Sequence, residues 1–161
     1  MLIDVTSFTS GPRQVENAVE EPKTANQVAV SERIKGYIAF FQPVFIRRAV
    51  GCVVGTEIEK YLDGHDEEDN EKEYIIQLLK EPFAEFVFFY MLRDMNVQPT
   101  ITGLVKLKCA NDYASTIDKG VQAWNRMVDG LNLFAKGVEG LGVEGVIIDD
   151  DMLTYINAFN L

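Results

Sequence analysis

Three glycines near the C-terminal end, Gly140, Gly142 and Gly145, have the spacing of the G-x-G-x-x-G fingerprint of dinucleotide-binding proteins. That fingerprint binds a pyrophosphate only where a β-strand leads into the glycines and an α-helix follows them, because the N-terminus of that helix receives the phosphates. Here a long helical pattern precedes the glycines, and only residues 146–161 follow them. We therefore predict no nucleotide cofactor and interpret the segment as a glycine-rich exit from a helix.

Two runs of acidic residues, Asp66 to Asp69 and Asp149 to Asp151, have side chains that can coordinate Ca²⁺ or Mg²⁺. A calcium loop of the EF-hand type places its oxygen ligands at alternate positions with a glycine at the sixth, and neither run has that arrangement. We therefore predict no metal site and interpret both runs as solvated. His65 is the single histidine of the chain, and it has no nucleophile at a catalytic spacing, so we do not expect it to act as a general base.

Other chemical motifs are missing from the sequence, which contains no G-x-S-x-G elbow, no Walker loop and no H-E-x-x-H. The two cysteines, Cys52 and Cys109, lie in apolar surroundings without a C-x-x-C spacing, which predicts buried free thiols. Trp124 lies on an apolar helical stripe and is expected in the core rather than in a stacking platform. We expect a protein that is not an enzyme and holds no cofactor.

The charge balance limits the partners of the chain. Lys and Arg number 15 against 25 Asp and Glu, a formal net charge of −10, which argues against a surface that grips nucleic-acid phosphates or anionic lipid. The most apolar stretch runs from Phe83 to Leu92 and is shorter than the roughly 20 residues that span a bilayer. The first residues lack the basic and apolar regions of a secretory signal. We expect no membrane partner.

The hydrophobic pattern divides the chain into an extended N-terminal arm (residues 1–23), a helical core (24–136) and a glycine-rich tail (137–161) that contains a short strand or helix. In the core, helices are predicted over about 24–41, 43–62, 70–95 and 115–137, with Pro43 ending the first and beginning the second. A period of two predicts a β segment near 100–109. The predicted fold is mainly α: a small bundle of four to five helices with a short β element and an extended N-terminal arm.

Three stretches of sequence carry a resemblance to a known family: "FQPVFIRRAVGCVVGTEIEKYLDG", "IIQLLKEPFAEFVFFYMLRD" and "TGLVKLKCANDYASTIDKGVQAWNRMV". In order and pattern, over about residues 30–135, they resemble the small helical head-to-tail connector (adaptor) proteins of tailed bacteriophages, especially those of Bacteroidetes phages and prophages. The resemblance implies a structural protein of the virion neck, assembled in the cytoplasm of the host bacterium. It implies a homo-oligomeric ring of about twelve copies between portal and tail proteins, through which DNA passes without specific binding.

Four basic residues are the candidate contacts in such a ring: Arg47, Arg48, Lys106 and Lys108. We expect them to meet acidic groups of adjoining subunits, although basic pairs of this kind are usually solvated on a helix face. The alternative is an acidic regulatory module that binds a basic protein through residues 63–73. A small enzyme with a carboxylate-bound metal is the third interpretation, which the metal content of the purified protein would test.

Overall fold

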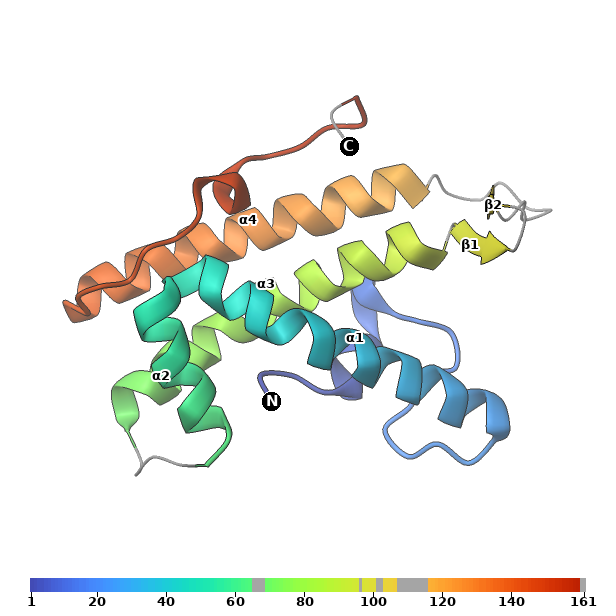
Figure 1. Cartoon of the computed structure of the whole chain (residues 1–161), viewed down its shortest axis with the longest axis horizontal. Coiled ribbons are helices and arrows are strands. Elements are labelled where there is room, and N and C mark those ends of the chain that lie inside the picture. Colours follow the sequence, from blue (N-terminus) through green and yellow to red (C-terminus); the bar gives the residue numbers. More distant parts are fainter. Residues whose placement is uncertain (65–68, 96, 101–102, 107–115, 160–161) are drawn as a thin grey trace.

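The computed structural model describes residues 1–64, 69–95, 97–100, 103–106 and 116–159. Within them the chain is mainly helical, as predicted, and its α-helices form a small bundle (Figure 1). Helices α3 and α4 lie side by side and antiparallel, α1 crosses them, and α2 follows α1 at one end (Figure 1). The bounds of the helices are α1 Ala25–Val50, α2 Cys52–Leu62, α3 Asn70–Met95 and α4 Thr116–Leu141.

Helix α1 begins with a capping box, in which the Thr24 hydroxyl accepts from the Gln27 amide and the Gln27 side chain accepts from the Thr24 amide. The helix continues through Pro43 and ends at Gly51, whose φ of 84° a helix cannot contain. The prediction that Pro43 separates two helices is therefore wrong. The turn beyond Pro43 buries Phe45, Ile46, Ala49 and Val50, and this packing outweighs the hydrogen bond that proline removes.

Glycines let α4 approach α3 closely. A methyl group on Gly130 would lie 3.1 Å from Cβ of Pro82, which is inside α3, and one on Gly137 would lie 2.7 Å from Cδ1 of Leu78. Gly137 thus belongs to the helix contact, and the prediction that it ends the helix is wrong. Helix α4 ends beyond it in a Schellman motif, with Gly142 at φ 70° and hydrogen bonds from Val143 N to Val138 O and from Gly142 N to Glu139 O.

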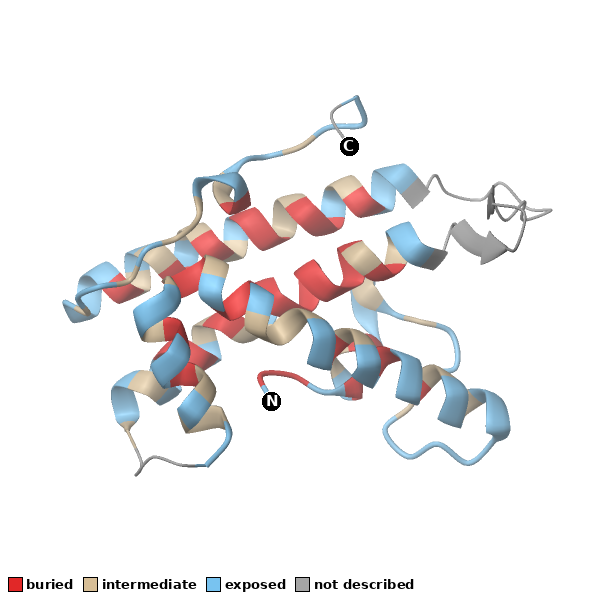
Figure 2. Ribbon diagram, in the orientation of Figure 1, coloured by how far each residue is buried: buried red, intermediate tan, exposed pale blue. Residues whose placement is uncertain are grey.

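Aromatic side chains from three helices form the centre of the core. The Phe86 ring on α3 lies 6.4 Å from the Trp124 ring on α4 and 5.3 Å from the Phe45 ring on α1, measured between centroids. The buried faces of α3 and α4 point toward each other and toward α1 (Figure 2). The expectation that Trp124 belongs to the core is confirmed, since it packs against Phe86 in this cluster.

A hairpin stands where one β segment was expected near 100–109. Strands β1 Val97–Thr100 and β2 Gly103–Lys106 pair antiparallel, with Val97 opposite Lys106 and Thr100 opposite Gly103. Residues 101–102 and 107–109 of the expected segment lie outside the described residues. Two short strands that pair with each other therefore stand in place of the single β segment that was predicted.

The prediction of an extended N-terminal arm is wrong, because this segment packs against the helices. It forms two 3-10 turns, η1 Val5–Phe8 and η2 Gly11–Arg13, rather than extended chain. Leu2, Val5 and Phe8 are buried among the core residues. The weak period of this segment concealed them, because the side chains of a 3-10 turn do not follow the spacing of a strand or of an α-helix.

Cys52 is exposed at the start of α2, so the prediction of a buried thiol is wrong for this residue, and Cys109 lies outside the described residues. None of the described helices combines the length and apolar composition needed to cross a membrane.

Candidate functional site

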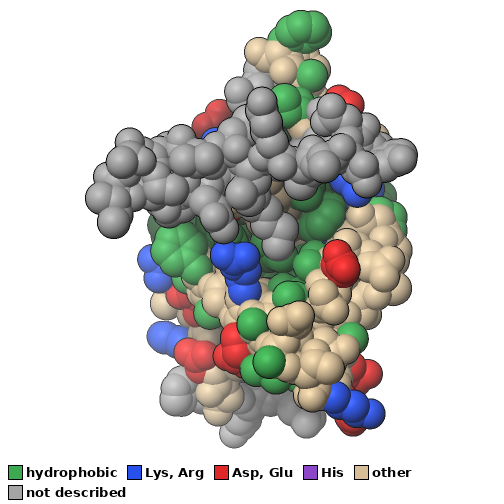
Figure 3. Space-filling view, turned by 90° about the vertical axis from the view of Figure 1, so that its right-hand side faces the viewer, with side chains coloured by type: hydrophobic (Ala, Val, Ile, Leu, Met, Phe, Trp, Pro, Cys, Tyr) green, Lys and Arg blue, Asp and Glu red, His purple; other side chains and the backbone are tan. Residues whose placement is uncertain are grey.

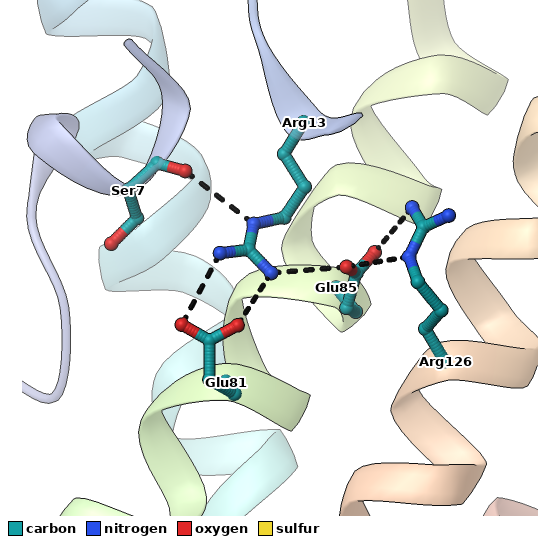
Figure 4. A network of polar contacts seen from close by, with 5 residues as sticks. All are labelled: Ser7, Arg13, Glu81, Glu85 and Arg126. Atoms are coloured by element: carbon teal, nitrogen blue, oxygen red, sulfur yellow. Dashed lines mark hydrogen bonds and ion pairs between the residues drawn. The ribbon is translucent and has the colours of Figure 1, made fainter. Parts of the chain in front are cut away.

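Glu85 is the one charged residue that the described part of the chain buries, with 5% of its surface exposed in the apolar half of α3. Its carboxylate accepts two hydrogen bonds from Arg126 of α4, at 2.7 Å from Nε and 2.9 Å from Nη2. Arg13 of the N-terminal segment donates a third at 3.0 Å (Figure 4). The carboxylate thus ties three segments of the chain together.

Arg13 extends this network to the surface. It makes a two-point contact with Glu81, at 2.7 and 3.3 Å, and donates to the carbonyl oxygen of Ser7 at 3.4 Å (Figure 4). Burial alone would lower the pKa of Arg13, but Glu81 and Glu85 stabilise the cation and raise that pKa above its ordinary value. Both carboxylates are occupied by guanidinium groups, so this cluster holds the fold together rather than offering an acid or a base to a substrate.

The second polar cluster binds the C-terminal segment along α4. Asn125 pairs with the main chain of Ile156 in both directions, accepting from its amide at 2.9 Å and donating to its carbonyl at 3.1 Å. Trp124 donates from Nε1 to the carbonyl oxygen of Thr154 at 2.8 Å. The C-terminal segment runs back along α4 in the opposite direction (Figure 1). Two neighbouring side chains of α4 therefore recognise the backbone of an extended segment.

Side chains of the same segment add to this contact. Tyr155 donates to Asp129 of α4 at 2.7 Å, and this bond to the neutral phenol raises the pKa of Tyr155. Met152 lies in the turn η3 Asp150–Leu153 and is fully buried. Where a short strand or helix was predicted within 137–161, the described residues form this four-residue 3-10 turn.

The same segment also completes the end of α1. The Asp149 amide donates to the carbonyl of Arg48 at 2.8 Å, and the Ile147 amide donates to that of Val50 at 3.3 Å, so two carbonyls of the last helical turn gain partners. The Arg48 side chain donates to the Asp149 carboxylate at 2.7 Å and, with the Asp151 amide, lowers the pKa of Asp149. Residues far apart in sequence thus form one junction.

The basic residues chosen from the sequence are engaged within the chain where their side chains are described. Arg48 pairs with Asp149, and Arg47 pairs with Glu59 of α2 at 3.2 Å while keeping 55% of its side chain exposed. Lys106 ends strand β2 and Lys108 lies outside the described residues; neither side chain is described. The structure therefore places two of the four side chains, those of Arg47 and Arg48, and each is paired within the chain.

The segments that suggested ligand chemistry have structural roles. Gly140 is inside α4, and Gly142 and Gly145 make turns at φ 70° and 83°, so a helix precedes the glycines and the short turn η3 follows. Asp69 caps α3 by accepting from the amides of Glu71 and Lys72, and these backbone bonds lower its pKa. His65 and residues 66–68 lie outside the described residues. Among the described residues, no group of acids, histidine or cysteine is arranged to hold a metal ion.

A shallow groove of about 360 Å³ lies between α1 and the end of α3. Its aromatic lining includes Tyr37, which donates to Asp94 at 2.9 Å, and Phe40, whose surface is 70% exposed. Burial, and then the bond to Asp94, raises the pKa of Tyr37. At the end of the molecule where α1 begins and α3 ends, hydrophobic side chains reach the surface among charged ones (Figure 3). The full lining is Arg33, Gly36, Tyr37, Phe40, Phe41 and Asp94.

Comparison with protein-family models, curated proteins and solved structures finds no match to this chain. From the sequence we did not single out Glu85, Arg13 and Arg126 of the first polar cluster, or Asn125 and Tyr155 of the second. Glu85 carried a usable signal, because it is the single polar residue between Phe83 and Leu92 and a buried charge requires partners. Asn125 carried no such signal, because asparagine is common on helices and only the folded structure shows that the backbone of Ile156 lies against it.

Proposed function

We propose that the chain is a structural subunit of a ring in the neck of a tailed bacteriophage, between the portal and the tail and around the DNA channel. The resemblance over residues 30–135 suggests this role. The structural observation that supports it most is the exposure of large apolar side chains: 70% for Phe40, 75% for Val53, 66% for Leu133 and 71% for Ile147. They lie on three helices and the C-terminal segment, and contacts with other subunits in the proposed ring would cover them.

The described polar side chains favour assembly over catalysis. The buried carboxylate of Glu85 is bound by two arginines, and Asn125 is occupied by the main chain of Ile156. These groups position segments of the protein, whereas a catalytic acid or base needs a free face toward a substrate. In the proposed role, the function of the chain depends instead on the surface that contacts other proteins.

The β hairpin has strand edges through which subunits can pair with one another in the proposed ring. The described sheet has two strands, so within it each strand keeps one edge with no strand beside it. Such an edge pairs readily with a strand of another chain. In the proposed ring, each hairpin adds to a neighbour through one edge, and head-to-tail contacts of this kind close when the rotation between copies completes a circle.

The net charge of −10 agrees with a channel that DNA crosses without being gripped. Tight binding of DNA requires cations that neutralise phosphates and release counterions, and an acidic wall lacks them. Lys106 and Lys108, together with the exposed part of Arg47, are proposed to meet acids of adjoining subunits instead.

Purified virions of the phage that encodes the chain test this role. We expect peptides of the chain by mass spectrometry and density for its helices in the neck by cryo-electron microscopy. If the peptides are missing, the neck assignment fails and the acidic regulatory module becomes the better proposal. Two described acids of the segment 63–73 already serve the chain itself, since Asp69 caps α3 and Glu73 accepts from Tyr61 at 3.3 Å.

A further inference from the structure

We propose that α4 carries a binding site for the C-terminal segment of a second copy of this chain, so that adjacent copies exchange residues 146–156. The site consists of Trp124, Asn125 and Asp129 on α4 and of the carbonyls at the end of α1. In the single chain, its own C-terminal segment fills this site.

The site recognises backbone, which any copy of the chain presents in the same way. The Asn125 amide accepts from and donates to one residue, Ile156, as a neighbouring β-strand would. Trp124 binds the carbonyl of Thr154 at 2.8 Å. These side chains bind the main chain of the segment, and side-chain pockets supply the specificity, as they do in strand addition.

Those pockets select this sequence rather than a foreign one. Met152 is fully buried against the core, and the Tyr155 hydroxyl bonds to Asp129. The Asp149 side chain pairs with Arg48 at the end of α1. A second copy offers the same methionine, tyrosine and aspartate at the same spacing, which makes an identical chain the matching partner.

The turn after α4 decides between two forms of the chain. In the closed chain the C-terminal segment lies on its own α4, and in the exchanged chain it lies on the α4 of another copy. Gly142, at φ 70°, and Gly145, at φ 83°, reverse the chain so that the segment returns along its own helix (Figure 1). If this turn opens, the segment leaves its own α4 and reaches that of a neighbour. Every contact of the segment is then made again between copies, so the exchange costs only the turn and the association of the chains.

This inference requires only that copies of the chain meet, which the proposed ring provides. Purified protein tests the exchange and virions test the neck assignment, so either proposal can fail without the other.

Cysteine crosslinking of the full chain tests the exchange directly. In a background of Cys52→Ser and Cys109→Ser, one protein carries Asp129→Cys and the other carries Tyr155→Cys. Because each protein has one thiol on one side of the contact, a short bismaleimide can join residues 129 and 155 only between two copies. We expect a crosslinked heterodimer whose yield rises with protein concentration, with the joined peptides identified by mass spectrometry.

A single protein that carries both cysteines is the matched control. We expect it to crosslink within one chain at low concentration. A crosslink within the chain but none between chains at any concentration would overturn the exchange. No crosslink in either experiment would overturn it as well, since the segment would then not lie on α4. Should either variant fail to fold, the pair Arg48→Cys and Asp149→Cys asks the same question at the end of α1.

Changing the turn gives a second, independent measurement. Alanine at a positive φ is strained, so Gly142→Ala disfavours the closed chain and leaves the open one unaffected. We expect the concentration that gives half-maximal crosslinking between chains to fall by about tenfold. Gly140→Ala is the control, since Gly140 is helical and has no neighbouring atom within 4 Å. Equal crosslinking by the two variants would contradict the exchange.

Discussion

Replacing Glu85 by glutamine keeps the shape of the side chain and removes the charge that two arginines share. The carboxylate accepts three hydrogen bonds from cations, at 2.7, 2.9 and 3.0 Å. Removing one partner from a buried ion pair costs about 3–5 kcal/mol. The lower end applies here, because Arg13 keeps its contact with Glu81 and Arg126 has 35% of its side chain exposed to water.

We therefore expect Glu85→Gln to lower the free energy of unfolding by about 3 kcal/mol, measured by urea titration. For a domain of this size that corresponds to a fall in melting temperature of roughly 6–12 °C. Glu81→Gln is the matched control, because Glu81 binds the same Arg13 with 76% of its side chain exposed. It should cost less than about 1 kcal/mol.

A double-mutant cycle isolates the contact between α3 and α4. Glu85→Gln and Arg126→Gln, alone and together, should show a coupling of roughly 2 kcal/mol, since the two residues share two short hydrogen bonds. If Glu85→Gln destabilised the protein no more than Glu81→Gln, or if the coupling were near zero, the carboxylate would not hold the segments together as the geometry indicates.

Three other tests, which use five substitutions in all, have defined outcomes. Phe86 is 1% exposed, so Phe86→Ala should lower the free energy of unfolding in urea by about 3–5 kcal/mol. Phe40 is 70% exposed, so Phe40→Ala should change that free energy by less than about 0.5 kcal/mol. Equal urea midpoints for the two variants would contradict the placement of Phe86 in the core. Gly130→Ala should destabilise by about 1–3 kcal/mol because a proline ring lies 3.1 Å from the new methyl. A methyl group on Gly36 would meet no atom within 4 Å, so Gly36→Ala should stabilise the protein by up to about 1 kcal/mol. If both Gly36→Ala and Gly130→Ala raised the melting temperature, the close contact between α3 and α4 would be refuted. The folded chain holds the pKa of Asp149 below its ordinary value of about 3.9, so its contribution is present above that pH and is lost as the pH falls through the lower, folded value. Asp149→Asn should therefore flatten the acid limb of stability against pH, and an unchanged limb would argue against the ion pair.

The helix that the sequence predicted best is α3. Its expected bounds, about Asn70 to Met95, agree with the structure. The reason is local: a long apolar stripe with polar neighbours indicates a helix, and its first turn is acidic. The core position of Trp124 followed from the same reasoning, because this residue lies on the apolar stripe of its helix.

Helix ends were predicted less well where local rules compete with packing. Pro43 has the chemistry of a helix stop, yet α1 passes through it because the next turn buries four residues. Gly137 has the chemistry of a helix end, yet it lies inside α4 because α3 needs the space that its missing side chain leaves. Both cases depend on a neighbour that is distant in sequence.

The sequence by itself determined the mainly helical class, the position of α3 and the central aromatic cluster, since these depend on residue spacing within one segment. Tertiary structure alone decided where the two ends of the chain go and which polar residues meet. Arg13 reaches Glu85, and Asn125 reaches Ile156, only after the helices have packed. Hydrogen bonds of this kind need two groups within about 3 Å, and the spacing of residues along a chain carries no information on distances across a fold.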